Sequence, residues 1–133
     1  MTSTYLYRLL KSSWGIRVSI TASAEPMVEL TSHAATQGRI HVRFVDSADS
    51  LTDDLKREVG NGLSIIEEEI VSAIKAPGAV ITVEDVSFNE ADFQLEGLAV
   101  AIIRWAEQEL SLPKREIKES FDRAANRYSF TFS

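Results

Sequence analysis

The chain has 133 residues, of which 44% are hydrophobic and 26% are charged. This length suits one domain and is too short for two domains of ordinary size. The apolar content excludes disorder over most of the chain. Because the sequence contains no cysteine, it excludes disulfides, thiolate metal ligands and cysteine nucleophiles.

The net charge of −6 is concentrated in the centre of the sequence. Residues 46–110 hold fifteen acidic and four basic residues, while the segments on either side are net positive. An acidic centre repels a phosphate backbone, which excludes DNA as a partner and disfavours RNA or the ribosome. A protein partner with a basic surface fits this charge better, and a homo-oligomer is also compatible with it.

The termini and the hydropathy pattern predict no membrane association. The N-terminal residues lack the apolar run and the small-residue cleavage site of a signal peptide. The longest apolar run, Leu98–Ile103, is far shorter than the roughly 20 residues that span a bilayer. We therefore expect a cytoplasmic protein.

Alternation of apolar and polar residues predicts strands in the first third of the chain. Gly15–Ala22 and Arg39–Val45 each alternate over their length, which is typical of strands buried on one face. Tyr5–Leu10 fits either a strand or a short helix. Pro26 should interrupt the first alternating strand, because proline cannot donate to the ladder, and Met27–Leu30 could resume it.

Two further expectations follow from this pattern. Thr36–Gly38 is predicted to form a turn before the second alternating strand. The basic positions of the two strands should lie on one side of the sheet, which would bring Arg17, Arg39 and Arg43 together.

A continuous helical stripe follows, with apolar residues every three or four positions from Leu51 to Ile74. Ser50 and Asp53 resemble a capping box at its start. Because each glycine costs about 1 kcal/mol in a helix interior, the helix is predicted to kink or break at 60–62, with Ser64 capping the second part. Lys75, followed by proline and glycine, should end it.

The segment Val80–Leu110 predicts a strand and then a helix. The strand alternates over Val80–Ser87, and the helix Phe93–Glu109 is apolar almost all round, which indicates burial on several sides or one side free for a partner. Asn89 or Asp92 is expected to cap this helix.

The C-terminal segment leaves two interpretations open. Residues 113–125 fit a helix beginning at Pro113, or the first arm of a hairpin whose second arm is Arg127–Phe132. The hairpin is slightly favoured, and Arg127–Phe132 is predicted to be a strand in either case.

No group of side chains in the sequence has the pattern of a catalytic, metal or cofactor site. The two histidines, His33 and His41, lack the further ligands of a zinc site. Acids crowd the junction between the strand and helix of Val80–Leu110, where a hard cation or an acid–base pair is conceivable, but helix capping explains them more simply. The candidate protein-binding residues are Glu84, Glu90, Asp92, Glu96 and Trp105.

The segment Val80–Ile102 resembles part of domain IV of elongation factor G, a translational GTPase. The matching side chains are Thr82, Asp85, Ser87, Phe88 and Asp92, with Leu98 at the apolar position of the helix. The preceding order of two strands and a long helix also fits. The resemblance implies the ribosomal S5 domain 2-like α+β fold.

The sequence departs from this family at the residues of its tip. Val86 replaces the turn glycine, Asn89 replaces the turn histidine, and Phe93 and Gln94 replace the paired serines. These are the family's positions near the decoding centre, so the resemblance does not imply a role in translocation.

Together these patterns predict a single α+β domain. We expect a two-layer sandwich with a mixed or antiparallel sheet of about four or five strands, two main helices, 51–75 and 93–110, on one face, and Arg127–Phe132 in the sheet. The expected function is a non-enzymatic acidic binding or accessory protein that engages a protein partner. An immunity protein that neutralises a basic toxin would be one instance.

Two other functions stay open from the sequence. One is a ribosome- or translation-associated factor with the elongation-factor fold. The other is an enzyme that uses the carboxylates of the 84–96 junction.

Overall fold

The computed structural model describes residues 2–27, 36–37 and 39–132. Its main element is a five-stranded sheet, in which the strand order is β1-β2-β5-β4-β3. The strands are β1 (Thr2–Leu10), β2 (Gly15–Met27), β3 (Thr36–Gln37), β4 (Ile40–Phe44) and β5 (Gly78–Phe88). All neighbouring pairs are antiparallel except β4 and β5, so the sheet is mixed.

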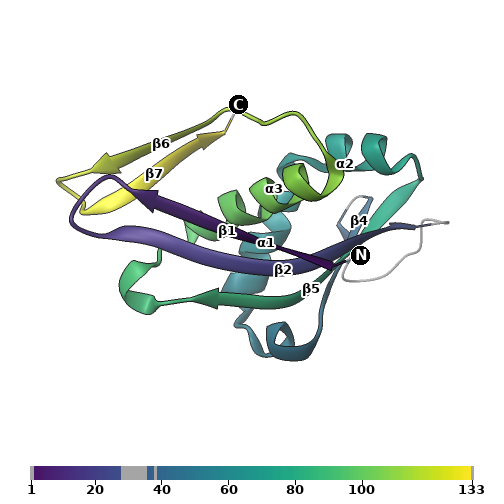
Figure 1. Cartoon of the computed structure of the whole chain (residues 1–133), viewed down its shortest axis with the longest axis horizontal. Helices are drawn as coiled ribbons and strands as arrows, with labels where there is room; N and C mark the ends of the chain where they lie inside the picture. Colours follow the sequence, from purple (N-terminus) through teal and green to yellow (C-terminus); the bar gives the residue numbers. More distant parts are fainter. Residues whose placement is uncertain (1, 28–35, 38, 133) are drawn as a thin grey trace.

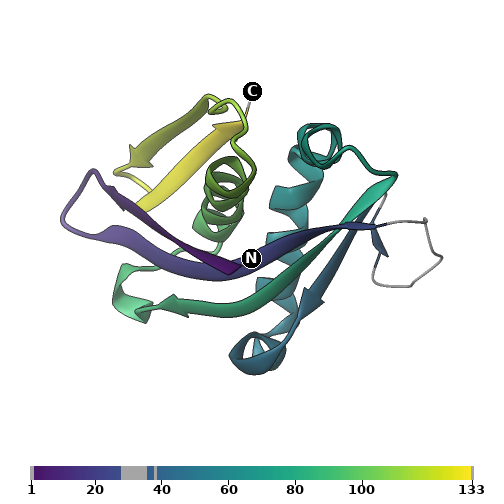
Figure 2. The ribbon, with the colours of Figure 1, turned by 45° about the vertical axis from the view of Figure 1, so that its right-hand side comes forward.

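Three α-helices pack on one face of this sheet. They are α1 (Asp53–Ile65), α2 (Glu67–Ile74) and α3 (Glu96–Leu110), and two 3₁₀ turns, η1 (Asp46–Ser50) and η2 (Glu90–Asp92), flank the strand ends. In Figures 1 and 2 the strands β2 and β5 pass in front of α1, so the face toward the viewer has no α-helix on it. The predicted α+β sandwich with its helices on one face is confirmed.

Alternation along the strands sends the apolar residues to the helices. Ile16, Val18 and Ile20 of β2 and Ile81 and Val83 of β5 are buried against the helical layer. The register between β2 and β5 shifts by one residue at a bulge, since Thr21 pairs with Asp85 but Ala22 pairs with Val83. This shift keeps the apolar residues of both strands on the helix side.

The N-terminal segment is a strand, one of its two predicted forms. The prediction that Pro26 interrupts β2 was wrong, since β2 continues to Met27 and Pro26 stands opposite Ala79. The turn predicted at 36–38 was also wrong for its first two residues, which form β3. The remainder of the strand predicted for Met27–Leu30, Gly38 of the turn, and His33 lie outside the described residues.

The long helical stripe does divide in two, but not at the glycines. The break lies at Ile66, and α1 runs unbroken through Gly60 and Gly62. A Cβ on Gly62 would lie 2.6 Å from Cγ2 of Ile102 and 2.7 Å from the carbonyl oxygen of Ala99 in α3. This glycine therefore serves the close approach of two helices, which outweighs its unfavourable helix propensity.

The capping predictions also need correction. Thr52 caps α1 by accepting a hydrogen bond from the backbone N–H of Leu55 at 3.3 Å, while the Ser50 hydroxyl donates to the carbonyl of Ser47. Asn89 caps η2 rather than the helix. α3 begins at Glu96, later than the predicted Phe93, and neither α2 nor α3 has a side-chain cap.

The prediction that Arg127–Phe132 joins the main sheet was wrong. This strand, β7, pairs only with β6 (Ile117–Asp122), and the two form a separate antiparallel hairpin. Asp122 favours this local pairing, because its carboxylate accepts hydrogen bonds from the N–H groups of Ala124 and Ala125 in the connecting turn. The hairpin lies beside the β1–β2 turn in both views (Figures 1 and 2).

Candidate functional site

On one face of the described sheet, called the uncovered face below, no α-helix packs. Short polar side chains cover most of it, and Thr4 and Thr21 are hydrogen-bonded across β1 and β2 at 2.8 Å between their hydroxyl oxygens. The residues that the strand registers place on this face include Thr2, Thr4, Leu6, Arg8, Arg17, Ser19, Thr21, Ser23, Arg43, Thr82, Asp85 and Ser87. Two arginines lie at one end of this face, and a group of acids lies along its β5 side.

The basic end of this face is formed by two arginines on adjacent strands. Arg8 of β1 stands directly opposite Arg17 of β2, and both side chains are exposed. The next row holds Leu6, Ser19 and Ser87, which are likewise cross-strand neighbours. We refer below to Leu6, Arg8, Arg17, Ser19 and Ser87 as the basic end.

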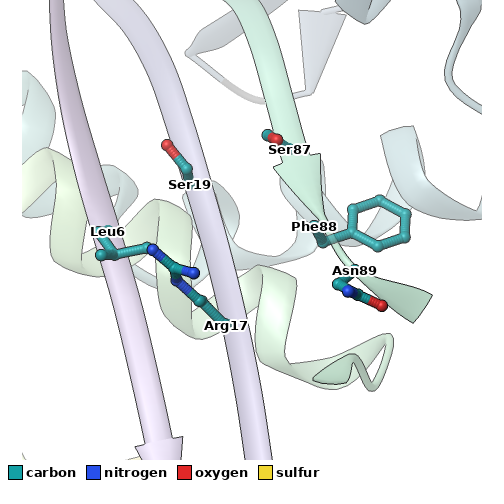
Figure 3. Close-up of a pocket in the computed structure, with 6 residues that line it drawn as sticks. All are labelled: Leu6, Arg17, Ser19, Ser87, Phe88 and Asn89. Atoms are coloured by element: carbon teal, nitrogen blue, oxygen red, sulfur yellow. The ribbon is translucent and has the colours of Figure 1, made fainter. Parts of the chain in front are cut away.

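A hollow of about 300 Å³ opens at the basic end, lined by Leu6, Arg17, Ser19, Ser87, Phe88 and Asn89. Figure 3 shows the Arg17 guanidinium lying beside Leu6, whereas the ring of Phe88 points away from both. That ring stacks on Phe93 on the helix side, with 4.0 Å between the ring centroids. Leu6, which is 39% exposed, is therefore the apolar wall of the hollow.

A second hollow, of about 460 Å³, adjoins the first. Both arginines line it, together with Asp92 of η2 and the residues around the β1–β2 turn. Arg17 is common to the two hollows. Asp92 is thus placed among basic residues and not among the other acids of its segment.

The acidic end lies where η1 packs against the bulge of β5. The Ser47 hydroxyl lies 2.6 Å from Oδ1 of Asp85 and 3.1 Å from the carbonyl oxygen of Glu84. These contacts bring Asp46 and Asp49, both exposed, to the same end as the two acids of β5. We refer to Asp46, Asp49, Glu84 and Asp85 as the acidic end.

The structure separates the four carboxylates predicted to form one protein-binding junction. Glu84 lies at the acidic end, where it accepts a hydrogen bond of 2.9 Å from the Thr2 hydroxyl. Glu90 is exposed on η2, and Asp92 lies near Arg8 and Arg17. Glu96 faces the C-terminal hairpin, so these side chains do not form a common surface.

Glu96 is paired with Arg127 and lies near a second acid, Glu58. Both of its carboxylate oxygens accept from Nη2 of Arg127, at 3.1 and 3.0 Å. Burial, and to a smaller extent the charge of Glu96, raises the pKa of Glu58 on α1, while a hydrogen bond from Asn61 lowers it. Glu96 therefore links α3 to the hairpin through Arg127.

Trp105 is not available as a contact residue on the folded chain. Its side chain is fully buried, and its Nε1–H lies 3.0 Å from Oγ and 3.2 Å from the backbone oxygen of Ser3. Ten residues of α3 are buried, so this helix owes its all-round apolar character to the core. The predicted site residue is in fact a core anchor between α3 and β1.

The basic end was only partly predictable from the sequence. Arg17 and Arg43 do share the uncovered face, as expected, but Arg39 lies in a turn and pairs with Glu68 on α2. Arg8 was missed because its segment fitted two kinds of element. The alternation of Arg8 with Leu6 would have indicated it once β1 was assigned as a strand.

Within residues 2–27, 36–37 and 39–132, no three His, Asp or Glu side chains converge in a way that could hold a metal ion. None of the described helices has the length and apolar character needed to cross a bilayer. No protein-family model matches the chain, and no curated protein matches it significantly.

Proposed function

We propose that this chain is a non-enzymatic binding protein whose acidic end engages a basic surface of a protein partner. The observation that carries the proposal is the packing of η1 on β5 through Ser47, which gathers Asp46 and Asp49 with Glu84 and Asp85. The helices α1 and α2 separate η1 from β5 in the sequence, so without this packing the two pairs of charges would not lie together.

The partners of these carboxylates leave their charge largely in place. Glu84 and Asp85 are bonded to hydroxyl groups, which stabilise an anion without neutralising it. Lys56 is a nearby cation, but its Nζ is 4.0 Å from Oδ1 of Asp49 and donates to the backbone oxygen of that residue. An exposed anionic cluster on a chain of net charge −6 attracts and orients a basic partner.

A small basic toxin bound by an immunity-type protein would be one instance of such a pair. In that case the acidic end would cover the toxin's cationic site. A cytoplasmic location would place the two proteins together, and this too belongs to the proposal.

The test compares two triple variants with the same change in charge. Asp46→Asn, Asp49→Asn and Glu84→Gln together remove three charges from the acidic end. Glu25→Gln, Glu90→Gln and Glu116→Gln together remove three exposed charges elsewhere. Each protein is immobilised and exposed to extract of its source cells, and the dissociation constant of any retained protein is then measured at several salt concentrations.

We expect the unmodified chain to retain a basic protein whose affinity falls as salt rises. The acidic-end variant should bind it at least about tenfold more weakly, a loss of about 1.4 kcal/mol, and the control variant should bind within about twofold of the unmodified chain. Equal losses in the two variants would show only a general charge effect and would overturn the proposed site. Retention of ribosomal particles in place of a single protein would favour the translation-associated alternative.

A further inference from the structure

We propose that the basic end is a binding site for a small organic carboxylate. Its carboxylate would lie beside Arg17 in the first hollow, with Arg8 next to Arg17 on the adjacent strand, and its apolar part would lie against Leu6 in the same hollow. This inference is independent of the proposed protein partner, because it concerns the arginines of β1 and β2 and not the acids of η1 and β5.

The first observation is the unfavourable arrangement of the two arginines. Side chains directly opposite each other on antiparallel strands are close neighbours, and like charges in these positions destabilise the pair. Among the described residues neither guanidinium makes a hydrogen bond or an ion pair with another side chain. A bound anion would relieve this repulsion and satisfy donors that the fold leaves to solvent.

The second observation is the supply of hydrogen-bond donors around one hollow. Ser19 and Ser87 are cross-strand neighbours, and both line the same hollow as Arg17. Asn89 contributes an amide whose oxygen already accepts from the N–H of Ala91 at 2.9 Å, so its Nδ2 group is left to donate. Guanidinium, hydroxyl and amide groups are the donors that recognise an oxyanion with two or more oxygens.

The size and walls of the hollow indicate an organic ligand. A volume of about 300 Å³ lies at the lower limit of small-molecule sites. Leu6 supplies an exposed apolar wall beside Arg17, as Figure 3 shows. An anion with a short apolar body could use both features at once.

The local charge favours a carboxylate over a phosphate. Arg8 and Arg17 line the second hollow together with Asp92, so two positive charges are offset by one negative charge. The remaining single positive charge balances a carboxylate, whereas a phosphate group carries more than one negative charge near neutral pH.

The experiment titrates the ¹⁵N-labelled full chain with benzoate and, separately, with phenyl phosphate and inorganic phosphate, and follows backbone amide shifts. We expect benzoate to give saturable shifts at residues 6–8, 17–19 and 87–89, with a millimolar dissociation constant typical of a small ligand on an open site. Phenyl phosphate should bind more weakly than benzoate. Tighter binding of either phosphate would overturn the assignment to a carboxylate.

Three variants decide whether the two arginines form the site. Arg8→Gln and Arg17→Gln should each weaken benzoate binding at least about fivefold and should leave the melting temperature equal or higher, since each removes the like-charge contact. Arg43→Gln removes an exposed arginine of the same face outside both hollows and is the matched control. Absence of saturable shifts, or an equal loss in the Arg43→Gln variant, would overturn the proposal.

Discussion

The five-stranded sheet and the C-terminal hairpin are held to the rest of the chain through different kinds of contact. The sheet and α1 meet α3 through apolar side chains at close range, including fully buried Trp105 and the contact of Gly62 with Ile102. The hairpin places Ile117 and Tyr128 in the core, but it is also attached through polar groups, such as Gln94 to Tyr128 and Glu96 to Arg127.

This difference has a consequence for stability. When a buried apolar side chain is shortened, the free energy of unfolding falls roughly in proportion to the cavity volume created, and this loss does not depend on pH. Polar attachments depend on complete pairing, because a buried donor or acceptor without a partner is costly. The sheet and the hairpin should therefore respond differently to substitution, and four predictions test this.

The largest effect should come from Trp105→Ala. The indole is completely buried between α3 and β1, so its removal leaves a large cavity and should lower the free energy of unfolding by about 3–5 kcal/mol. Denaturant unfolding measures the loss. Leu10→Ala is the control, because Leu10 is 74% exposed and its change should stay within about 0.5 kcal/mol. Similar losses in both variants would contradict the assignment of Trp105 to the core.

The second effect concerns the polar attachment of the hairpin. The buried amide of Gln94 donates to the carbonyl of Tyr128 at 2.7 Å and accepts from its N–H at 2.8 Å. Gln94→Ala leaves both backbone groups without this partner, so we expect a loss of about 2 kcal/mol and faster hydrogen exchange at the Tyr128 amide. Exposed Gln108→Ala is the control. Unchanged protection of Tyr128 would show that the hairpin is held mainly by its aromatic contacts.

Those aromatic contacts are the apolar part of the hairpin's attachment. Trp14 from the β1–β2 turn packs edge-on against Tyr128 and Phe121, with ring centroids 5.0 and 6.0 Å apart. The Tyr128 hydroxyl also donates to the Trp14 carbonyl at 2.6 Å and accepts from the N–H of Lys11 at 2.9 Å. The hairpin and the β1–β2 turn therefore support each other beside the basic end.

The third prediction distinguishes the two glycines of α1. Gly62→Ala should destabilise the protein by about 1 kcal/mol, since the added methyl group forces α1 away from α3 and this outweighs the gain in helix propensity. Gly60→Ala on the same helix should instead stabilise it by up to about 1 kcal/mol. Thermal unfolding of both variants measures the two signs. Stabilisation by Gly62→Ala would mean that the helices separate at little cost.

The sequence predicted most elements of the fold, because alternation and helical periodicity record which side of each element is buried. It misplaced the helix break and the last strand for a common reason. The favoured C-terminal hairpin is confirmed, but its separation from the main sheet depends on tertiary packing, as the close approach of Gly62 depends on α3, and neither can be inferred from the local pattern. The helix break itself falls at Ile66, a residue with good apolar periodicity.

The candidate site was less predictable than the fold. Acids close in sequence were expected to act together, but the structure pairs Glu96 with Arg127 and places Asp92 near Arg8 and Arg17. The acidic end forms only because η1 folds onto the bulge of β5, and the basic end needs the register of β1 on β2. Both groups depend on tertiary contacts, which the distribution of charge along the sequence does not predict.

The smallest effect at neutral pH should be that of Tyr7, whose hydroxyl donates to Glu119 and so links β1 to the hairpin. Burial, reinforced by this hydrogen bond and by the charge of Glu119, raises the pKa of Tyr7 far above its ordinary value of 10.0. The folded state then keeps its proton where the unfolded state releases it. Stability from this source is fully present below about pH 10 and is lost as pH rises above that value.

Comparison with Tyr7→Phe isolates this contribution, because phenylalanine keeps the ring and has no proton to release. We expect the free energy of unfolding of the unmodified chain to fall more steeply than that of Tyr7→Phe between about pH 10 and 11.5, as measured by urea unfolding. The two curves should run parallel between about pH 7 and 9. Parallel curves through the alkaline range as well would show that Tyr7 ionises freely, and that the hairpin's polar attachment is open to solvent at this point.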